Sequence, residues 1–191
     1  MRICVYGASS DEIRDVYIKE GEALGLAMAK RGIELVFGAG AGGMMGAVAR
    51  GVTQGGGHMI GVVPMFFNVD GILYDKCDEL IRTETMRERK QIMEDNADAF
   101  IMTAGGIGTF EEFYEILTLK QLGRHNKAIV VLNTDGYFNK LQQMMDYAVS
   151  EGFIYESVLE LYKAASTVDE ALDYIEGYIP PEIQPSVYKK V

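Results

Sequence analysis

Cysteine and histidine are both rare in this sequence. The 191 residues contain two cysteines, Cys4 and Cys77, and two histidines, His58 and His125. A framework of disulfide bonds therefore cannot form, which is typical of proteins in a reducing compartment. Because the cysteines and histidines are not clustered, a zinc site is not predicted. Nothing in the pattern of carboxylates indicates another metal, and we expect no cofactor.

Long hydrophobic runs are also missing. No apolar stretch approaches the length of about 20 residues that a membrane-spanning helix needs. Residues 1–7 predict a short strand and lack the apolar core of a secretion signal. We therefore expect a cytoplasmic protein that does not act at a membrane.

Positive charge is in deficit. Lysine and arginine total 18 against 28 aspartate and glutamate residues, which gives a formal net charge of −10. An acidic chain repels polyphosphate, so we expect no nucleic-acid partner. A small anionic ligand remains compatible with this charge, provided that helix N-termini and a few basic side chains form a locally positive pocket.

Composition and patterning predict one α/β domain. Apolar residues make up 48% of the chain and charged residues 24%, close to the averages of globular proteins. Strand-like runs alternate with helical patterns of about 10–15 residues, which predicts a three-layer, Rossmann-like, doubly wound parallel sheet. We expect this domain at residues 1–178, followed by an extended C-terminal tail at residues 179–191, where prolines interrupt regular structure.

The order of the elements predicts where a ligand binds. Ligands of parallel sheets bind beyond the carboxyl ends of the strands, so the loops after the first, second and fifth strands form the predicted site. Ser9 with Glu12, and Thr85 with Glu88, have the spacing of capping boxes at helix starts. We expect strands at residues 3–6, 33–37, 58–63, 79–83, 99–103, 127–132 and 159–164, and helices at residues 9–30, 44–54, 85–96, 109–122, 137–151 and 168–178.

Glycine is over-represented, and ten of the 22 glycines lie between residues 38 and 61. Residues 38–43, Gly-Ala-Gly-Ala-Gly-Gly, match the G-x-G-x-x-G pattern between a strand and a helix. A dinucleotide site also needs an acidic residue about 20 positions later. None occurs between Glu34 and Asp70. NAD binding is therefore disfavoured, and the alternative is that Gly43, Gly46 and Gly51 allow the helix to pack closely against the sheet.

A second glycine loop covers residues 105–109, Gly-Gly-Ile-Gly-Thr. It is not a P-loop, because no Gly-Lys-Ser/Thr follows. It does place several main-chain amides and the Thr109 hydroxyl at a helix N-terminus, which suits a monophosphate. The alternative is a tight turn in which Thr109 caps the helix. Three glycines in four residues exceed what a cap requires, which favours anion binding.

Two charged side chains near this loop have two interpretations each. Glu112 lies three residues after Thr109, so it either completes a capping box or reaches the sugar of a bound nucleotide. Arg89 either extends to the surface or is buried and needs an anion. A carboxylate and a guanidinium beside a phosphate favour a reaction in which positive charge develops on a sugar, such as cleavage of an N-glycosidic bond.

These residues carry a resemblance to a known family. Residues 86–90, Met-Arg-Glu-Arg-Lys, followed by residues 104–112, Ala-Gly-Gly-Ile-Gly-Thr-Phe-Glu-Glu, resemble motifs of the Lonely Guy family, and the similarity covers about residues 1–178. Its members are cytokinin riboside 5′-monophosphate phosphoribohydrolases, often mislabelled as lysine decarboxylases. The resemblance implies a homodimer that hydrolyses N6-substituted AMP to a free base and ribose 5-phosphate. It implies Arg89 and Glu112 as the catalytic pair, with substrate contacts from Lys90, Gly105, Gly106, Ile107, Gly108, Thr109, Thr118, Gly43 and Met44.

The chain departs from the family pattern at three places. Ala104 stands where the motif has proline, which loosens the start of the loop, and Arg87 stands where it has histidine, which bears on recognition of the base. Met65 and Phe66 lie where family members carry an acidic ligand contact. These departures favour the alternative of a non-catalytic nucleotide sensor or carrier on the same fold, and a structural protein is a third hypothesis. A lysine decarboxylase is not predicted, because no lysine is marked as a Schiff-base site.

Overall fold

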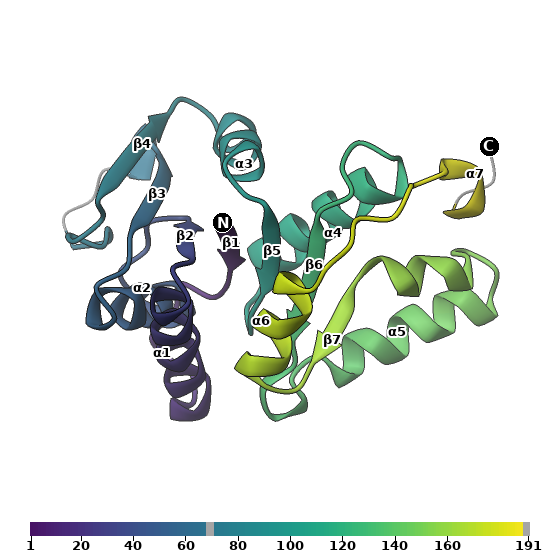
Figure 1. The fold of residues 1–191 in the computed structure, drawn as a ribbon, viewed down its shortest axis with the longest axis horizontal. Coiled ribbons are helices and arrows are strands. Elements are labelled where there is room, and N and C mark those ends of the chain that lie inside the picture. The colour runs from purple at the N-terminus through teal and green to yellow at the C-terminus, as the bar shows by residue number, and fades with distance from the viewer. Residues whose placement is uncertain (68–70, 189–191) are drawn as a thin grey trace.

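The computed structural model describes residues 1–67 and 71–188. The described chain forms a parallel sheet in the strand order β4-β3-β2-β1-β5-β6-β7 (Figure 1). The predicted parallel α/β class is therefore confirmed. The strands are β1 (Arg2–Tyr6), β2 (Glu34–Phe37), β3 (Met59–Pro64), β4 (Glu79–Thr83), β5 (Ala99–Met102), β6 (Ala128–Leu132) and β7 (Lys163–Ala165).

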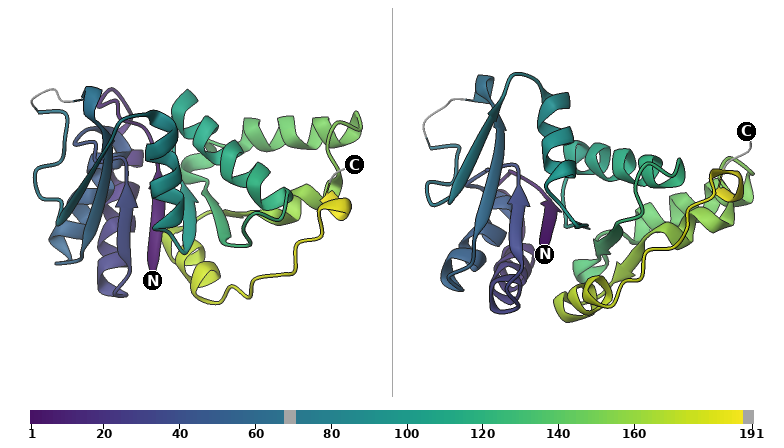
Figure 2. Two further views of the ribbon diagram at one scale, coloured as in Figure 1. Left: turned by 90° about the horizontal axis from the view of Figure 1, so that it is seen from above. Right: turned by 45° about the horizontal axis from the view of Figure 1, so that its top comes forward.

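Helices cover both faces of this sheet (Figures 1 and 2). Buried side chains of α1, α2 and α6 share one apolar cluster with the sheet, and those of α3, α4 and α5 share the other. This division confirms the three-layer, doubly wound arrangement. The helices are α1 (Asp15–Lys30), α2 (Gly43–Gln54), α3 (Met86–Asp95), α4 (Ile107–Gln121), α5 (Asn139–Ser150), α6 (Val168–Glu176) and the short α7 (Pro185–Tyr188).

The central strands are apolar throughout because both of their faces are covered. Successive side chains of a strand point to opposite faces. In β1, Ile3 and Val5 pack into the cluster with α1 and α2, whereas Cys4 and Tyr6 pack into the cluster with α3 and α4. This double burial explains the near-continuous hydrophobic strands of the sequence.

The strand order places a crevice between β1 and β5. The chain runs outward from β1 through β2 and β3 to β4, and then returns to pair β5 with the other side of β1. At such a reversal the loops after the two neighbouring strands lead to opposite faces of the sheet, which opens a ligand-binding crevice at their carboxyl ends. The sequence placed the site at this edge.

Two glycines allow α1 and α2 to pack closely. A Cβ atom on Gly25 would lie 2.0 Å from the carbonyl oxygen of Val48, and one on Gly51 would lie 2.1 Å from that of Glu22. The close-packing interpretation is therefore correct for Gly51, although the surface that it meets belongs to α1.

Several element boundaries differ from the prediction. The helix α1 begins at Asp15 after Arg14, so the expected start at Ser9 is wrong. Ser10, not Ser9, accepts a hydrogen bond from the amide of Glu12 (3.2 Å), and this segment is a loop that borders the crevice. At α3 the prediction is confirmed, because the Thr85 hydroxyl accepts from the amide of Glu88 (3.1 Å).

The C-terminal third shows further differences. Residues expected to begin the last strand form a 3-10 helix at Glu156–Leu161, and β7 is shorter than predicted. The described part of the tail contains the short helix α7 and lies at the same end of the molecule as α5 (Figure 2). The side chain of Gln121 on α4 donates to the carbonyl oxygen of Tyr188 at 2.6 Å, which ties this tail to α4. Residues 189–191 lie outside the described part of the chain.

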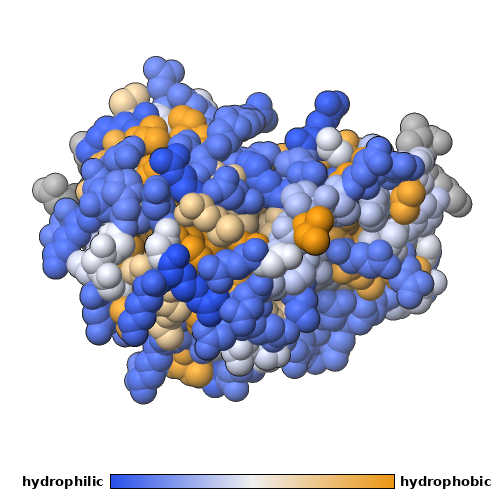
Figure 3. All heavy atoms as spheres, viewed as in Figure 1, coloured by the Kyte–Doolittle hydropathy of each residue, from blue (hydrophilic) through white to orange (hydrophobic). Residues whose placement is uncertain are grey.

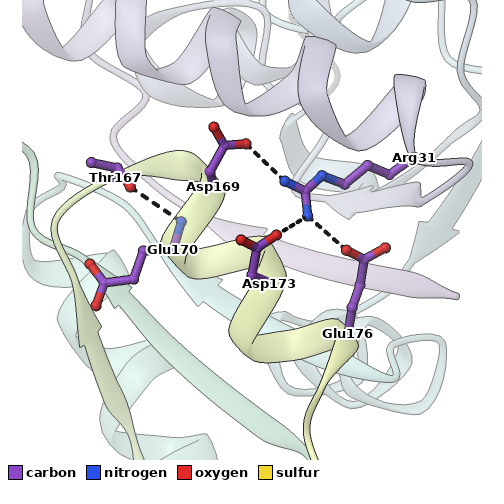
Figure 4. A network of polar contacts seen from close by, with 6 residues as sticks. All are labelled: Arg31, Thr167, Asp169, Glu170, Asp173 and Glu176. Atoms are coloured by element: carbon purple, nitrogen blue, oxygen red, sulfur yellow. Dashed lines mark hydrogen bonds and ion pairs between the residues drawn. The ribbon is translucent and has the colours of Figure 1, made fainter.

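An arginine fastens α6 to the end of α1 (Figure 4). The guanidinium of Arg31 contacts the carboxylates of Asp169, Asp173 and Glu176 at 2.8, 2.6 and 2.7 Å. Their spacing of three or four residues places the carboxylates on one helix face. The start of α6 is capped by Thr167, whose hydroxyl accepts from the amide of Glu170.

The visible surface is mostly hydrophilic, with hydrophobic patches between the charged side chains (Figure 3). Within residues 1–67 and 71–188, the helices are too short or too polar for any of them to cross a membrane.

Candidate active site

The crevice at the carboxyl end of the sheet holds a cavity of about 710 Å³. All three loops that the sequence pointed to contribute to its wall: residues 7–11 after β1, residues 38–42 after β2 and residues 106–109 after β5. The side chains of Arg89 from α3 and Glu112 from α4 close one side. The predicted location of the site is therefore where the structure has its large cavity.

One glycine-rich loop lines this cavity at the N-terminus of α4. We call residues 105–109 the amide loop. Gly106 is the N-cap of α4 and has no side chain to satisfy the first amides of the helix. A Cβ atom on Gly106 or Gly108 would meet nothing within 4 Å, so these glycines leave open space above the loop. A Cβ on Gly105 would lie 2.1 Å from the Thr109 hydroxyl oxygen, so Gly105 is required for the turn itself.

The capping interpretation of Thr109 is wrong. Thr109 is the third residue of α4 rather than its N-cap, and it is 3% exposed. Glu112 makes its hydrogen bond to Arg89 and not to the helix start. The helix N-terminus therefore keeps its amides free for a ligand, which is the arrangement of known anion sites.

Arg89 and Glu112 form a buried ion pair. Nη1 of Arg89 lies 2.9 Å from Oε1 of Glu112, and their side chains are 9% and 12% exposed. Nε of Arg89 also donates to the carbonyl oxygen of Val62 at 3.1 Å. A Cβ atom at Gly38 would lie 2.0 Å from Nη2 of Arg89, so the glycine after β2 makes room for the guanidinium. Of the two interpretations, the structure supports a buried arginine with an anionic partner.

Burial shifts the pKa of the Glu112 carboxyl group. The pKa of Glu112 is raised above its ordinary value, because the loss of solvation outweighs the attraction of Arg89 and the hydrogen bond from it. A carboxyl group with a raised pKa holds its proton more readily than an ordinary glutamate, which suits acid–base work.

The N-terminus of α2 is closed by an aspartate. Oδ1 of Asp11 accepts a hydrogen bond from the amide of Gly43 at 2.8 Å. Gly43 has a left-handed φ of 56°, and a Cβ atom there would lie 2.5 Å from the carbonyl oxygen of Ala8. A carboxylate at this helix end repels a pyrophosphate, so the G-x-G-x-x-G segment serves packing and turning of the chain. No sequence pattern pointed to Asp11, because it lies in an irregular loop whose approach to Gly43 depends on the tertiary fold.

Not every residue implied by the resemblance reaches the cavity. Nζ of Lys90 pairs with Glu111 and with Glu115 (2.8 Å) outside the cavity wall. Thr118 is exposed on α4, about 14 Å along the helix axis from Thr109. Gly43 and Met44 also lie outside the cavity wall, and Gly105 lines a smaller neighbouring cavity.

Part of the cavity wall is apolar. Its lining residues come from α2, from β3 and the irregular segment after it, and from α3; sequence reasoning missed most of them because that segment has no periodicity. Phe66 and Met65 are exposed and do not line the cavity, whereas their neighbour Phe67 does. Residues 68–70 lie outside the described chain. The apolar lining is Met45, Val63, Phe67, Ile72, Leu73 and Met86.

Comparisons with known proteins decide the family. The profile of a family described as "Possible lysine decarboxylase" matches residues 45–175. The probable cytokinin riboside 5′-monophosphate phosphoribohydrolase LOGL3 of Oryza sativa subsp. japonica is 40% identical over 179 residues, which cover 94% of this chain and 85% of that protein. The cytokinin riboside 5′-monophosphate phosphoribohydrolase LOG2 of Arabidopsis thaliana is 37% identical over 94% of this chain and 84% of its own length. The chain belongs to the Lonely Guy family.

Solved structures share the fold of this Lonely Guy chain. The molybdenum cofactor carrier protein of Chlamydomonas reinhardtii matches with a TM-score of 0.70 and 23% identity over 92% of this chain and 95% of that chain. A molybdenum cofactor binding protein of Rippkaea orientalis matches with a TM-score of 0.68 and 20% identity, over 92% of this chain and 93% of that one. At this identity the likeness concerns the fold.

The two motif departures lie in different surroundings in this Lonely Guy protein. Ala104 is buried at the start of the amide loop, 4% exposed, and its carbonyl oxygen accepts from the amide of Ala8 at 3.1 Å. Arg87 is exposed on α3 and lies outside the cavity wall, while its neighbour Met86 lines the cavity. The first departure therefore adjoins the amide loop, and the second lies away from the cavity.

Proposed function

We propose that this chain hydrolyses the N-glycosidic bond of AMP-type nucleoside 5′-monophosphates with an N6 substituent. The products are a free base, the cytokinin, and ribose 5-phosphate. One observation carries the proposal: the Arg89–Glu112 pair, 2.9 Å apart, lines the same cavity as the free amides of the amide loop. Relatives named as phosphoribohydrolases at up to 40% identity support it.

The amide loop is the proposed phosphate site. Its amides and the Thr109 hydroxyl lie at the N-terminus of α4, where the helix dipole contributes about half a positive charge. Bound there, a 5′-phosphate fixes one end of the nucleotide. The ribose then lies between the loop and Glu112.

The ion pair acts on the sugar. Bond breakage between C1′ and the base leaves positive charge on the ribose, which a carboxylate stabilises through space, by covalent addition or by activating water. In the balanced reaction, water adds its hydroxyl group to C1′ and its second proton goes to the departing base. Glu112 touches the reacting atoms in each case, and Arg89 orients its carboxyl group through the hydrogen bond of 2.9 Å.

The apolar part of the cavity wall takes the base. Its side chains include Met45, Phe67, Ile72 and Met86, which suit a flat ring that carries an apolar substituent. No lysine lines the cavity among the described residues, and Lys90 is paired with glutamates outside it. The lining therefore gives no support to the decarboxylase that the family description suggests.

Product analysis tests the proposal. The protein is incubated with AMP and with isopentenyladenosine monophosphate, and free base is measured by chromatography. We expect Glu112→Gln to lower kcat at least about 100-fold, because the neutral amide neither stabilises a cation nor accepts a proton. Glu111→Gln is the matched control, since Glu111 pairs with Lys90 outside the cavity. Equal turnover by Glu112→Gln and the parent, or no cleavage of any purine nucleotide, contradicts the assignment.

A nucleotide sensor or carrier is the second candidate. Ala104 and Arg87 depart from the catalytic motifs, and the solved structures with this fold include proteins described as carriers. Tight binding of AMP in a calorimeter, followed by recovery of intact nucleotide, favours this candidate over hydrolysis.

A homodimer in the cytoplasm completes the proposal. Side chains from α4, from α5 and from the turn after α5 expose a large apolar area, with Met144 60% and Phe153 83% exposed. Such side chains are typical of a partner surface. Sedimentation at the dimer mass is expected, and sedimentation at the monomer mass contradicts it.

Both cysteines are free, as expected of a reducing compartment, and fractionation of cells tests the location.

A further inference from the structure

A tyrosine from the turn after β6 contacts the amide loop. The hydroxyl of Tyr137 donates to the carbonyl oxygen of Gly105 at 2.7 Å. Tyr137 follows β6 and lines a small second cavity of about 200 Å³, which shares Ala8, Ser10 and Gly106 with the large one. The hydrogen bond therefore reaches the loop from this second cavity and not from the large cavity in which we place the phosphate.

The geometry of the peptide bond transmits this contact. The carbonyl of Gly105 and the amide of Gly106 belong to one planar trans peptide unit, so they point in opposite directions and turn together. A donor that holds the carbonyl on one side also aims the amide on the other. Gly106 lines the main cavity, where a phosphate would take that amide.

The position of Tyr137 is fixed by the turn before it and by a neighbouring aromatic ring. The turn before it contains two successive left-handed residues, Asp135 (φ 52°) and Gly136 (φ 70°), which direct the chain toward the loop. The ring meets that of Tyr17 edge to face, with centroids 5.6 Å apart. Arg14 donates to the hydroxyl of Tyr17 at 2.8 Å and pairs with Asp135, which braces the turn against the start of α1.

Ala104 makes this brace more important. A proline at this position, as in the family motif, fixes its own φ and restricts the residue before it. Alanine supplies no such restraint. The next residue along the chain is Gly105, which has the greatest backbone freedom and accepts the hydrogen bond from Tyr137.

We propose that Tyr137 is a positioning residue for phosphate recognition. Its hydroxyl orients the Gly105–Gly106 peptide so that the Gly106 amide meets the 5′-phosphate, a restraint that the loop of this chain does not obtain from a proline. The inference rests on the proposed function, because it takes the amide loop as the phosphate site.

Tyr137→Phe removes the hydroxyl and keeps the ring. We expect KM for AMP and the dissociation constant of ribose 5-phosphate to rise about fivefold, with kcat changed less than twofold, because one hydrogen bond that orders the site is lost. Binding of adenosine, which has no phosphate, is expected to stay the same. Adding Ala104→Pro to Tyr137→Phe should recover most of the affinity for ribose 5-phosphate, because proline restricts the same loop.

Tyr162→Phe is the matched control. It also removes one tyrosine hydrogen bond, to Gln142 at 2.9 Å, but far from the amide loop, so all constants should stay within twofold of the parent. The inference is overturned if Tyr137→Phe binds ribose 5-phosphate as tightly as the parent, or if adenosine and ribose 5-phosphate weaken together. Calorimetry separates the two proposals, because failure of the parent to bind ribose 5-phosphate contradicts the phosphate site itself.

Discussion

Two helix N-termini of this protein follow glycine-rich loops, and they have opposite roles. At α2 the carboxylate of Asp11 accepts from the amide of Gly43 at 2.8 Å, so the helix end is closed. At α4 the N-cap is Gly106, and the first amides face a cavity of about 710 Å³. A glycine pattern before a helix therefore indicates an anion site only where no side chain of the protein already satisfies the amides.

The partners around each helix end explain the difference. Opposite the start of α4 lies a compensated pair, Arg89 with Glu112, whereas the start of α2 adjoins an aspartate with no cation bonded to it in the described chain. We therefore expect a phosphate to be favoured at the start of α4 and repelled at the start of α2. Three expectations follow from the contrast, in descending order of size.

Arg89→Met should have the largest effect. It leaves Glu112 buried without its cation, which we expect to lower stability at neutral pH by about 3–5 kcal/mol and to abolish turnover. The pKa of Glu112 is already raised above 4.5 by burial, and loss of Arg89 raises it further. A raised carboxyl pKa means that the variant is least impaired below pH 4.5 and loses stability as pH rises through the folded-state value. Denaturant unfolding across pH checks this, and a pH-independent difference from the parent contradicts it.

At the C-terminal end of α4, Lys120 should have a smaller effect on stability, with the opposite dependence on pH. Lys120 is 1% exposed and donates to the carbonyl oxygen of Lys127 and to the hydroxyl of Tyr178. Burial lowers its pKa from 10.5 to about 8. A depressed lysine pKa means that the folded state gains stability as pH rises from about 8 to 10.5, by up to about 3 kcal/mol. Lys120→Met should lack this rise, and an identical pH profile for both proteins contradicts the expectation.

A pair of alanine substitutions compares the two loops directly. Gly43→Ala puts a Cβ atom 2.5 Å from a carbonyl oxygen at a left-handed φ of 56°, so we expect a loss of about 2 kcal/mol in stability. Gly106→Ala meets nothing within 4 Å and has an ordinary φ of −101°, so stability should change little. Its methyl group extends into the space proposed for the ligand and keeps the phosphate away from the main-chain amides. We therefore expect KM to rise about tenfold. Thermal unfolding and steady-state kinetics of both variants measure these two effects. Equal stabilities of the two variants would contradict the expected difference between the loops.

Much of the fold could be predicted from local sequence patterns, because the order of the elements and the hydrophobicity of the strands indicate the same architecture. Alternating strands and helices predicted the doubly wound sheet, and strands that are apolar on both faces agree with two covering layers. The last strand was predicted to begin at residue 159, but residues 159–161 belong to a 3-10 helix and β7 begins at Lys163. Short apolar runs do not distinguish these two outcomes.

The candidate site was only partly predictable. Thr109 and Glu112 have the spacing of a capping box, yet Arg89, 23 residues before Glu112, takes the carboxylate. Local spacing says nothing of such a tertiary partner. Asp11 and Phe67 lie in irregular segments without periodicity, so no pattern could place them in the cavity wall. The resemblance supplied Lys90 and Thr118, and a single copy of the chain brings neither to the cavity.

The attachment of α6 by Arg31 has a consequence for how the molecule opens. The carboxylates of Asp169 and Asp173 are largely in contact with water, with side chains 80% and 69% exposed, so dissolved ions screen their attraction to the guanidinium. The apolar contacts of Leu172 beneath them are insensitive to such screening. Rising ionic strength should therefore speed hydrogen–deuterium exchange within α6, while the amides of the central strands stay protected. We expect this helix to be the first part of the domain to open locally in concentrated salt.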